Sequence, residues 1–127
     1  MKPFARMMEW LQEPPQPLTS RQRRVLWITT ALVAATRLAA LAASLWDWDE
    51  VLFCRGVRDF EVDQHNPHPP GFPLYIALAK IANLVIGSEF RSLQAITAIA
   101  AIALLHLTFF LARELRLPFL PAWLGAL

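Results

Sequence analysis

Two long apolar stretches dominate the pattern of hydrophobic and polar positions along the chain. Residues 25–46 carry a single charge, Arg37, and residues 93–112 carry no formal charge. At about 1.5 Å of helix per residue, each stretch is long enough to cross a hydrocarbon layer of about 30 Å. The pattern therefore predicts two transmembrane helices, over residues 25–46 and 91–112.

The two ends of the chain fit the same plan. Residues 1–24 combine an amphipathic stripe, five basic side chains and a proline-rich linker, with Thr19 or Ser20 as a possible helix cap. These basic residues place the N-terminus in the cytoplasm under the positive-inside rule. Residues 113–117 then form a cytoplasmic turn, and 118–127 read as the start of a third transmembrane helix. Because the chain stops inside this apolar run, we expect it to be the N-terminal part of a larger protein.

A third apolar stretch, residues 73–86, determines the topology. It corresponds to only about 21 Å of helix and it contains Lys80, so it is short for a membrane span. If it crossed the membrane, Arg113 and Arg116 would lie on the outer side, against the positive-inside rule. We therefore expect it to lie in the membrane interface, within a long periplasmic loop over residues 47–90.

This loop is predicted to hold two short interfacial helices joined by a rigid corner. Residues 50–60 place Phe53, Val57 and Phe60 on one helical face. In the second helix, over 73–86, proline suits the first turn and Gly87 suits the C-terminal cap. Four prolines in residues 67–73 restrict the backbone between these helices to an extended corner.

Composition narrows the class of protein further. The chain is 56% hydrophobic and 17% charged, whereas soluble domains average about 45–50% and about 25%. This excludes a water-soluble enzyme, an all-β fold and a disordered tail, and it favours an all-α polytopic membrane protein. The net charge of +2 does not indicate a nucleic-acid partner, because the basic residues lie where membrane topology requires them. A single cysteine, Cys54, leaves no internal disulfide to form.

The acidic run at the predicted outer boundary is the sharpest chemical feature. Asp47, Asp49 and Glu50 are three carboxylates in four residues, which is costly at a membrane boundary unless they are paired, hydrated or used. They could supply a general base or ligands for a hard metal ion. Alternatively, Asp47 and Glu50 could form a helix capping box, an interpretation that leaves Asp49 unexplained.

Other polar residues of the loop are candidate substrate ligands. His65 and His68 lie on the proline-rich corner, and Arg55 and Arg58 could contact a phosphate. Alternatively, the two histidines are ordinary polar residues of a loop, and the two arginines form ion pairs in contact with solvent. Arg37 lies within the predicted first span. There it could pair with the phosphate of a lipid that carries a substrate, or it could form a structural ion pair.

Together, these motifs resemble the glycosyltransferase C superfamily. Residues 48–81 are similar to the first outer loop of bacterial polyprenyl-phosphate-sugar transferases, and protein O-mannosyltransferases carry Asp-Glu and His-Pro-Pro in the same order. The resemblance implies an enzyme of the bacterial inner membrane that acts on the periplasmic side. Its donor would be a sugar on a polyprenyl phosphate, transferred with inversion to a hydroxyl of a glycan, lipid or protein.

The resemblance also assigns roles to residues. Asp49 matches the proposed catalytic base, Glu50 its acidic neighbour, and His68 the corner that shapes the site. The additional Asp47 leaves open which carboxylate is the base, and a divalent ion such as Mg²⁺ or Mn²⁺ is possible. The later spans of the family are missing, so we expect this segment alone to be inactive. The alternative is a small non-catalytic membrane protein, or a truncated relic, that binds a partner through the loop.

Overall fold

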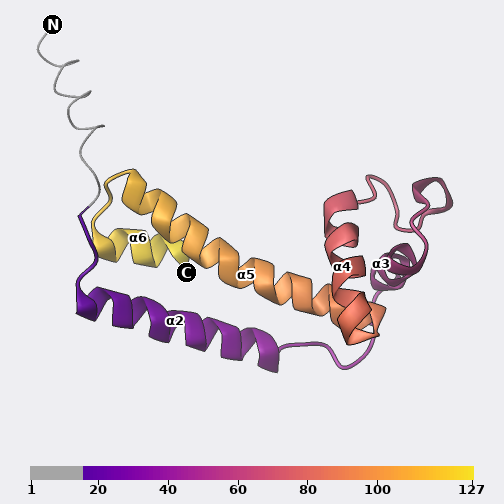
Figure 1. The fold of residues 1–127 in the computed structure, drawn as a ribbon, viewed down its shortest axis with the longest axis horizontal. Coiled ribbons are helices and arrows are strands. Elements are labelled where there is room, and N and C mark those ends of the chain that lie inside the picture. Colours follow the sequence, from indigo (N-terminus) through magenta and orange to yellow (C-terminus); the bar gives the residue numbers. More distant parts are fainter. Residues whose placement is uncertain (1–15) are drawn as a thin grey trace, which may run out of the picture. The chain divides into compact units, whose positions relative to one another are not determined.

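The computed structural model describes residues 16–127, and its regular structure is helical throughout that range. The elements are α2 (Ser20–Ala39), α3 (Trp48–Arg58), the short 3-10 helix η1 (Val62–Gln64), α4 (Pro73–Ile86), α5 (Glu89–Glu114) and α6 (Phe119–Ala126) (Figure 1). Over these residues the only β pairing is an isolated bridge between Glu61 and Asn66. The all-α prediction is confirmed, whereas the amphipathic stripe predicted near the N-terminus lies outside the described residues.

Helix α5 is the one described helix that is long and apolar enough to cross a membrane. It contains the whole span predicted at 91–112, and little of its apolar segment is buried within the protein. Helix α2 does not meet the same criterion, because four arginines lie within its 20 residues. The structure thus contains one candidate span, and a second transmembrane helix stays a prediction.

The boundaries of α2 differ from the predicted range 25–46. The helix begins at Ser20 because Thr19 and Gln22 form a capping box: the Gln22 N–H donates to Thr19 Oγ1 (3.2 Å), and the Thr19 N–H donates to Gln22 Oε1 (2.9 Å). It ends at Ala39, before the apolar run does. The Ala42 carbonyl instead accepts a hydrogen bond from Gln94 Nε2 (2.9 Å). The helix is therefore shorter than predicted at this end, and no local sequence signal reveals the tertiary contact that Ala42 makes beyond it.

The described chain forms two compact units, one of which combines residues 16–32 with 103–127. Its centre is Phe109 of α5, which is fully buried and whose ring lies 5.7 Å from the Phe119 ring of α6. Hydrogen bonds across helices add to this packing: Trp123 Nε1 donates to Thr29 Oγ1 (3.0 Å), and the Thr30 hydroxyl lies 3.3 Å from His106 Nε2. Such polar contacts hold helices together where apolar packing alone is weakly specific.

We expect Trp123→Phe to destabilise this unit by about 0.5–1.5 kcal/mol, the range for one lost intramolecular hydrogen bond. The loss arises because the mostly buried Thr29 hydroxyl no longer receives the indole N–H. Trp46→Phe is the matched control, since the Trp46 side chain is largely exposed. Unfolding free energies of both variants in detergent micelles check this. Equal losses at the two positions would show that the Thr29 contact contributes nothing.

The other unit comprises residues 33–102 and holds every residue of the predicted loop. Helices α3 and α4 lie side by side (Figure 1). A hydrophobic cluster joins them, formed by the buried side chains of Val57, Ile76 and Ala79 together with Leu93 of α5. Arg58 at the end of α3 donates two hydrogen bonds to Glu89 Oε1 at the start of α5 (3.1 and 3.0 Å). This unit therefore fixes α3 against α4 and the beginning of α5.

The helix predicted at 73–86 is confirmed with the same bounds, whereas its position in the membrane interface stays a prediction. Pro73 occupies its first turn, and Gly87 ends it in the left-handed region at φ 70°, where its N–H donates to Asn83 O. The helix predicted at 50–60 is present as α3, displaced toward the N-terminus. It starts at Trp48 because the Val51 N–H donates to the carbonyl of Asp47, which is the N-cap residue.

Candidate functional site

The carboxylates at the start of α3 divide into two groups. Asp47 occupies the N-cap position, but its side chain makes no capping hydrogen bond. Glu50 Oε2 accepts the backbone N–H of Trp46 at 2.7 Å, so this carboxylate stabilises the entry into the helix. The capping box proposed for Asp47 and Glu50 therefore forms in part, with Trp46 in place of Asp47 as the donor. Asp49 takes no part in it.

Asp49 instead faces the proline-rich corner. Its Oδ1 lies 3.7 Å from Nδ1 of His68, a residue far along the chain. The Asp49 side chain is 59% exposed, while His68 Nδ1 is enclosed and makes no hydrogen bond within the described residues. The fold thus brings the acidic motif and the His-Pro-Pro motif together, and a small movement would turn this approach into a charge-assisted hydrogen bond.

Aromatic rings hold His68 in this position. The Phe53 ring meets the imidazole edge-on at 5.7 Å, and it also meets Phe72 at 5.5 Å and Tyr75 at 5.7 Å. Phe53 lies one helical turn after Asp49 on α3, so both residues face the corner. Offset and edge-on ring pairs of this kind stabilise a fixed arrangement beyond simple burial.

Gly56 of α3 allows the proline-rich corner to pack closely against the helix. A Cβ at this position would lie 2.6 Å from Cδ of Pro67 and 3.1 Å from the carbonyl carbon of Asn66. Both loop residues are buried, and Asn66 Oδ1 has no hydrogen-bond partner in the part of the chain that is described. Sequence analysis missed this contact. A glycine inside an otherwise helical segment was the available signal, since it costs about 1 kcal/mol relative to alanine unless packing requires it.

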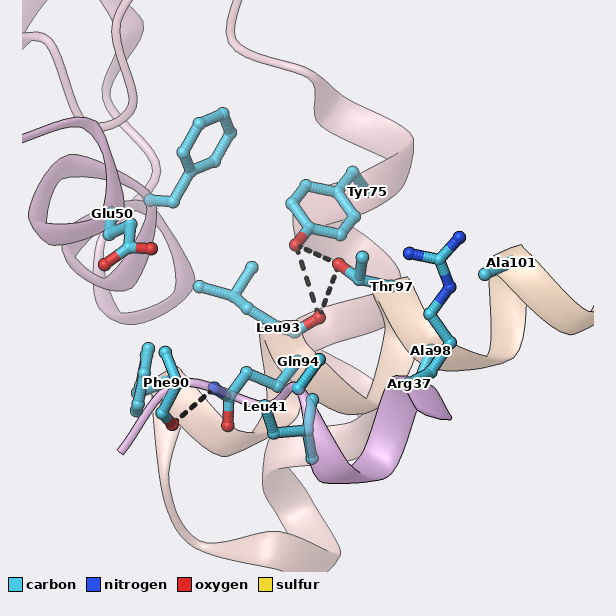
Figure 2. Close-up of a pocket in the computed structure, with 13 residues that line it drawn as sticks. Arg37, Leu41, Glu50, Tyr75, Phe90, Leu93, Gln94, Thr97, Ala98 and Ala101 are labelled. Carbon is cyan, nitrogen blue, oxygen red and sulfur yellow. Dashed lines mark hydrogen bonds between the residues drawn. The ribbon is translucent and has the colours of Figure 1, made fainter. Parts of the chain in front are cut away.

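A pocket of about 360 Å³ lies beside these residues. Its walls come from the end of α2, the start of α3, Tyr75 of α4 and the first part of α5. Figure 2 shows Glu50 and Arg37 on opposite sides of it, with Tyr75 and Thr97 between them. The Tyr75 hydroxyl lies 2.9 Å from Thr97 Oγ1 and donates to the Leu93 carbonyl at 3.3 Å. The size is within the range of small-molecule sites, about 300–1,000 Å³.

The remaining predicted ligands lie apart from this pocket. His65 ends η1 in the left-handed region and is exposed, and Arg55 is also exposed. Arg58 pairs with Glu89, a partner that sequence analysis did not consider. Of the seven predicted site residues, Glu50 lines the pocket, and Asp49 and His68 form a pair next to it. Tyr75, Gln94 and Thr97 are pocket residues that the sequence did not reveal.

The described residues do not assemble a metal site by themselves. Across residues 16–127, no three His, Cys, Asp or Glu side chains lie close enough to hold an ion. Asp49 and His68 would provide two ligands, whereas Mg²⁺ prefers six oxygen ligands in octahedral geometry. A metal ion at this position would therefore need further ligands from elsewhere.

Cys54 is a packing residue rather than a nucleophile. Burial raises the pKa of its thiol, and the nearby carboxylates of Glu89 and Glu50 raise it further. The thiolate is the reactive form, so a raised pKa leaves less of it at neutral pH. The side chain packs beside Val57 in the hydrophobic core between α3 and α4.

We therefore expect iodoacetamide to alkylate Cys54 several-fold more slowly in the folded protein than in the unfolded chain at about pH 8. Because the folded-state pKa is raised, the folded-state rate should continue to rise at pH values where the unfolded rate has levelled off. Cys54 is the only cysteine, so adduct mass reports this site alone. Equal rates in the folded and unfolded protein would contradict a buried, deactivated thiol.

Comparison with known proteins adds no relative. No protein-family model, curated protein or solved structure matches the chain. The functional interpretation therefore depends on the arrangement of Asp49, His68 and the pocket. An exposed carboxylate held beside an imidazole is suited to accept a proton from a hydroxyl group.

Proposed function

We propose that this chain is the N-terminal part of an integral-membrane glycosyltransferase. It would move a sugar from a polyprenyl-phosphate donor to a hydroxyl acceptor on the outer, periplasmic side of the inner membrane. One observation carries the proposal: the chain folds so that Asp49 of the acidic motif approaches His68 of the His-Pro-Pro motif to 3.7 Å. These are the two motifs on which the resemblance to the glycosyltransferase C superfamily rests.

In the proposed reaction, Asp49 is the general base. Its carboxylate accepts the proton of the acceptor hydroxyl as the hydroxyl oxygen forms a bond to C1 of the sugar. The bond between C1 and the phosphate oxygen breaks on the opposite face, and the carrier leaves as polyprenyl phosphate. Attack from the face opposite the leaving group inverts the anomeric centre. His68 positions Asp49, because its Nδ1 lies 3.7 Å from Asp49 Oδ1.

Glu50 is better suited to a structural role than to that of base. Its carboxylate already accepts the Trp46 N–H at 2.7 Å, which restrains its movement. Asp47 lies at the N-cap of α3 with its side chain exposed. Among the three candidate carboxylates, Asp49 alone is placed against the second motif.

The proposed topology places this site at the outer membrane boundary. Helix α5 spans the membrane with Glu89 at its outer end and Arg113 at its inner end, in agreement with the positive-inside rule. Helix α4 exposes large apolar side chains, among them Leu84 and Val85, as expected of a helix in contact with lipid or with further spans. The donor's chain can then remain in lipid while its sugar reaches the aqueous side.

The proposal is tested by sugar transfer in membranes that contain the full natural gene product. Polyprenyl-phosphate mannose and polyprenyl-phosphate glucose with tritium in the sugar serve as donors, and conversion of the labelled donor into any other labelled product is followed by thin-layer chromatography. We expect transfer above the level of membranes from a deletion strain. No transfer from either donor, combined with a native mass of 14.4 kDa for the gene product, would favour the alternative of a small membrane protein that binds a partner.

A further inference from the structure

The charges around the pocket are unevenly distributed. Arg37 is the only cationic side chain among the lining residues, and Glu50 is the only anionic one. The two lie on opposite sides, and the wall near Arg37 is formed by small side chains such as Ala98 and Ala101 (Figure 2). Glu50 is already engaged by the Trp46 N–H. The Arg37 side of the pocket therefore presents a positive charge that Glu50 does not neutralise.

Arg37 has no partner among the residues that the structure places. Its guanidinium makes neither a hydrogen bond nor an ion pair there, although it lies in the last turn of α2, where the helix dipole favours a cation. The neighbouring α5 segment belongs to the candidate membrane span. Arg37 is itself exposed, and in the proposed topology a cation beside an apolar membrane segment is costly unless an anion or water compensates it.

We propose that Arg37 binds the phosphate of a lipid phosphate whose hydrocarbon chain leaves the pocket along the apolar surface of α5. The planar guanidinium matches two phosphate oxygens at once, which gives both affinity and orientation. The walls are mostly apolar, so a phosphate attached to a hydrocarbon chain gains from burial of its methylene groups, whereas free phosphate does not.

This inference rests on the proposed function for the identity of the remaining ligand groups. With the phosphate at Arg37, the group attached to it extends across the pocket toward Glu50, next in sequence to Asp49. The paired hydroxyls of Tyr75 and Thr97 lie on this path and retain acceptor capacity for hydrogen bonds to a sugar. Arg37 would thus hold the leaving group of the reaction, and the opposite side of the pocket would face the acceptor.

Binding of farnesyl phosphate to the full-length protein in an uncharged detergent, followed by calorimetry, tests the assignment without an activity assay. We expect farnesyl phosphate to bind at least ten-fold more tightly than farnesol, inorganic phosphate or dioctanoyl phosphatidylglycerol. Arg37→Gln should weaken farnesyl phosphate binding at least ten-fold, and Arg24→Gln on the same helix should leave it unchanged. Ala98→Leu, which keeps the charge but narrows the pocket, should weaken it as well.

Several results would overturn the assignment. These are unchanged binding in a folded Arg37→Gln protein, equal binding of farnesol or inorganic phosphate, or equal binding of phosphatidylglycerol, which would mark a general lipid contact. If Arg37→Gln fails to fold, the Ala98→Leu variant decides, because retained binding there excludes the pocket. Arg37-dependent binding without sugar transfer would refute the proposed enzyme but keep the lipid phosphate site. Sugar transfer combined with farnesyl phosphate binding that does not depend on Arg37 would support the proposed enzyme but refute the lipid phosphate site at Arg37.

Discussion

Replacing Asp49 by asparagine is expected to slow sugar transfer by at least ~10²-fold, the lower end of what a positioned general base contributes. The substitution preserves size and shape but removes the lone pair that accepts the hydroxyl proton. The protein should still fold, because the Asp49 side chain is 59% exposed and its 3.7 Å separation from His68 is too long for a hydrogen bond. Initial rates from tritiated polyprenyl-phosphate donors in membranes of the full-length protein provide the measurement.

Two further variants show whether the effect is specific. Asp63→Asn removes an exposed carboxylate in η1, away from the pocket, and should leave the rate unchanged. Glu50→Gln should reduce the rate less than Asp49→Asn, since its main contact is the Trp46 backbone. A rate for Asp49→Asn within two-fold of wild type would exclude Asp49 as the base. A larger loss for Glu50→Gln would transfer that role to Glu50.

Replacing Gly56 by alanine is expected to destabilise the unit formed by residues 33–102. The new Cβ would lie 2.6 Å from Pro67 Cδ and 2.8 Å from Pro67 N, and backbone atoms cannot move aside as a flexible side chain can. Overpacking of this kind costs about 1–3 kcal/mol, which should exceed the gain of about 1 kcal/mol from better helix propensity. We expect a net loss of up to about 2 kcal/mol in unfolding free energy.

The same substitution should also reduce transfer. Displacing Asn66 and Pro67 moves His68 relative to Asp49, and misplacement by about 1 Å can cost up to ~10² in rate. Gly125→Ala is the matched control, because a Cβ there meets nothing within 4 Å and only the helix propensity changes. Stability and transfer that are unchanged in both variants would show that the corner does not depend on the close approach at Gly56.

The sequence was most informative where local chemistry decides the structure. Proline in the first turn and glycine at the end defined α4 to the residue, and Thr19 was one of the two caps expected for the first helix, although the predicted span began only at residue 25. These signals act over three or four positions, so they can be read without knowledge of the fold.

Tertiary contacts decided the features that the sequence did not reveal. Beyond the end of α2, the carbonyl of Ala42 accepts a hydrogen bond from Gln94, which lies far along the chain. The pocket likewise needs Tyr75 and Thr97 from different helices. For the site itself, sequence analysis named Asp49 and His68 separately, but their approach depends on the space above Gly56. Local patterns do not encode such distances.

A double-mutant cycle on sugar transfer is the most direct test of the claim that Asp49 and His68 form one reaction centre. Asp49→Asn, His68→Gln and the double variant are compared with wild type in membranes of the full-length protein. Residues that act as a unit show strongly non-additive effects on rate. We predict that the double variant is about as slow as Asp49→Asn alone. Losses that simply multiply, or a His68→Gln rate equal to wild type, would contradict a joint role for the two residues.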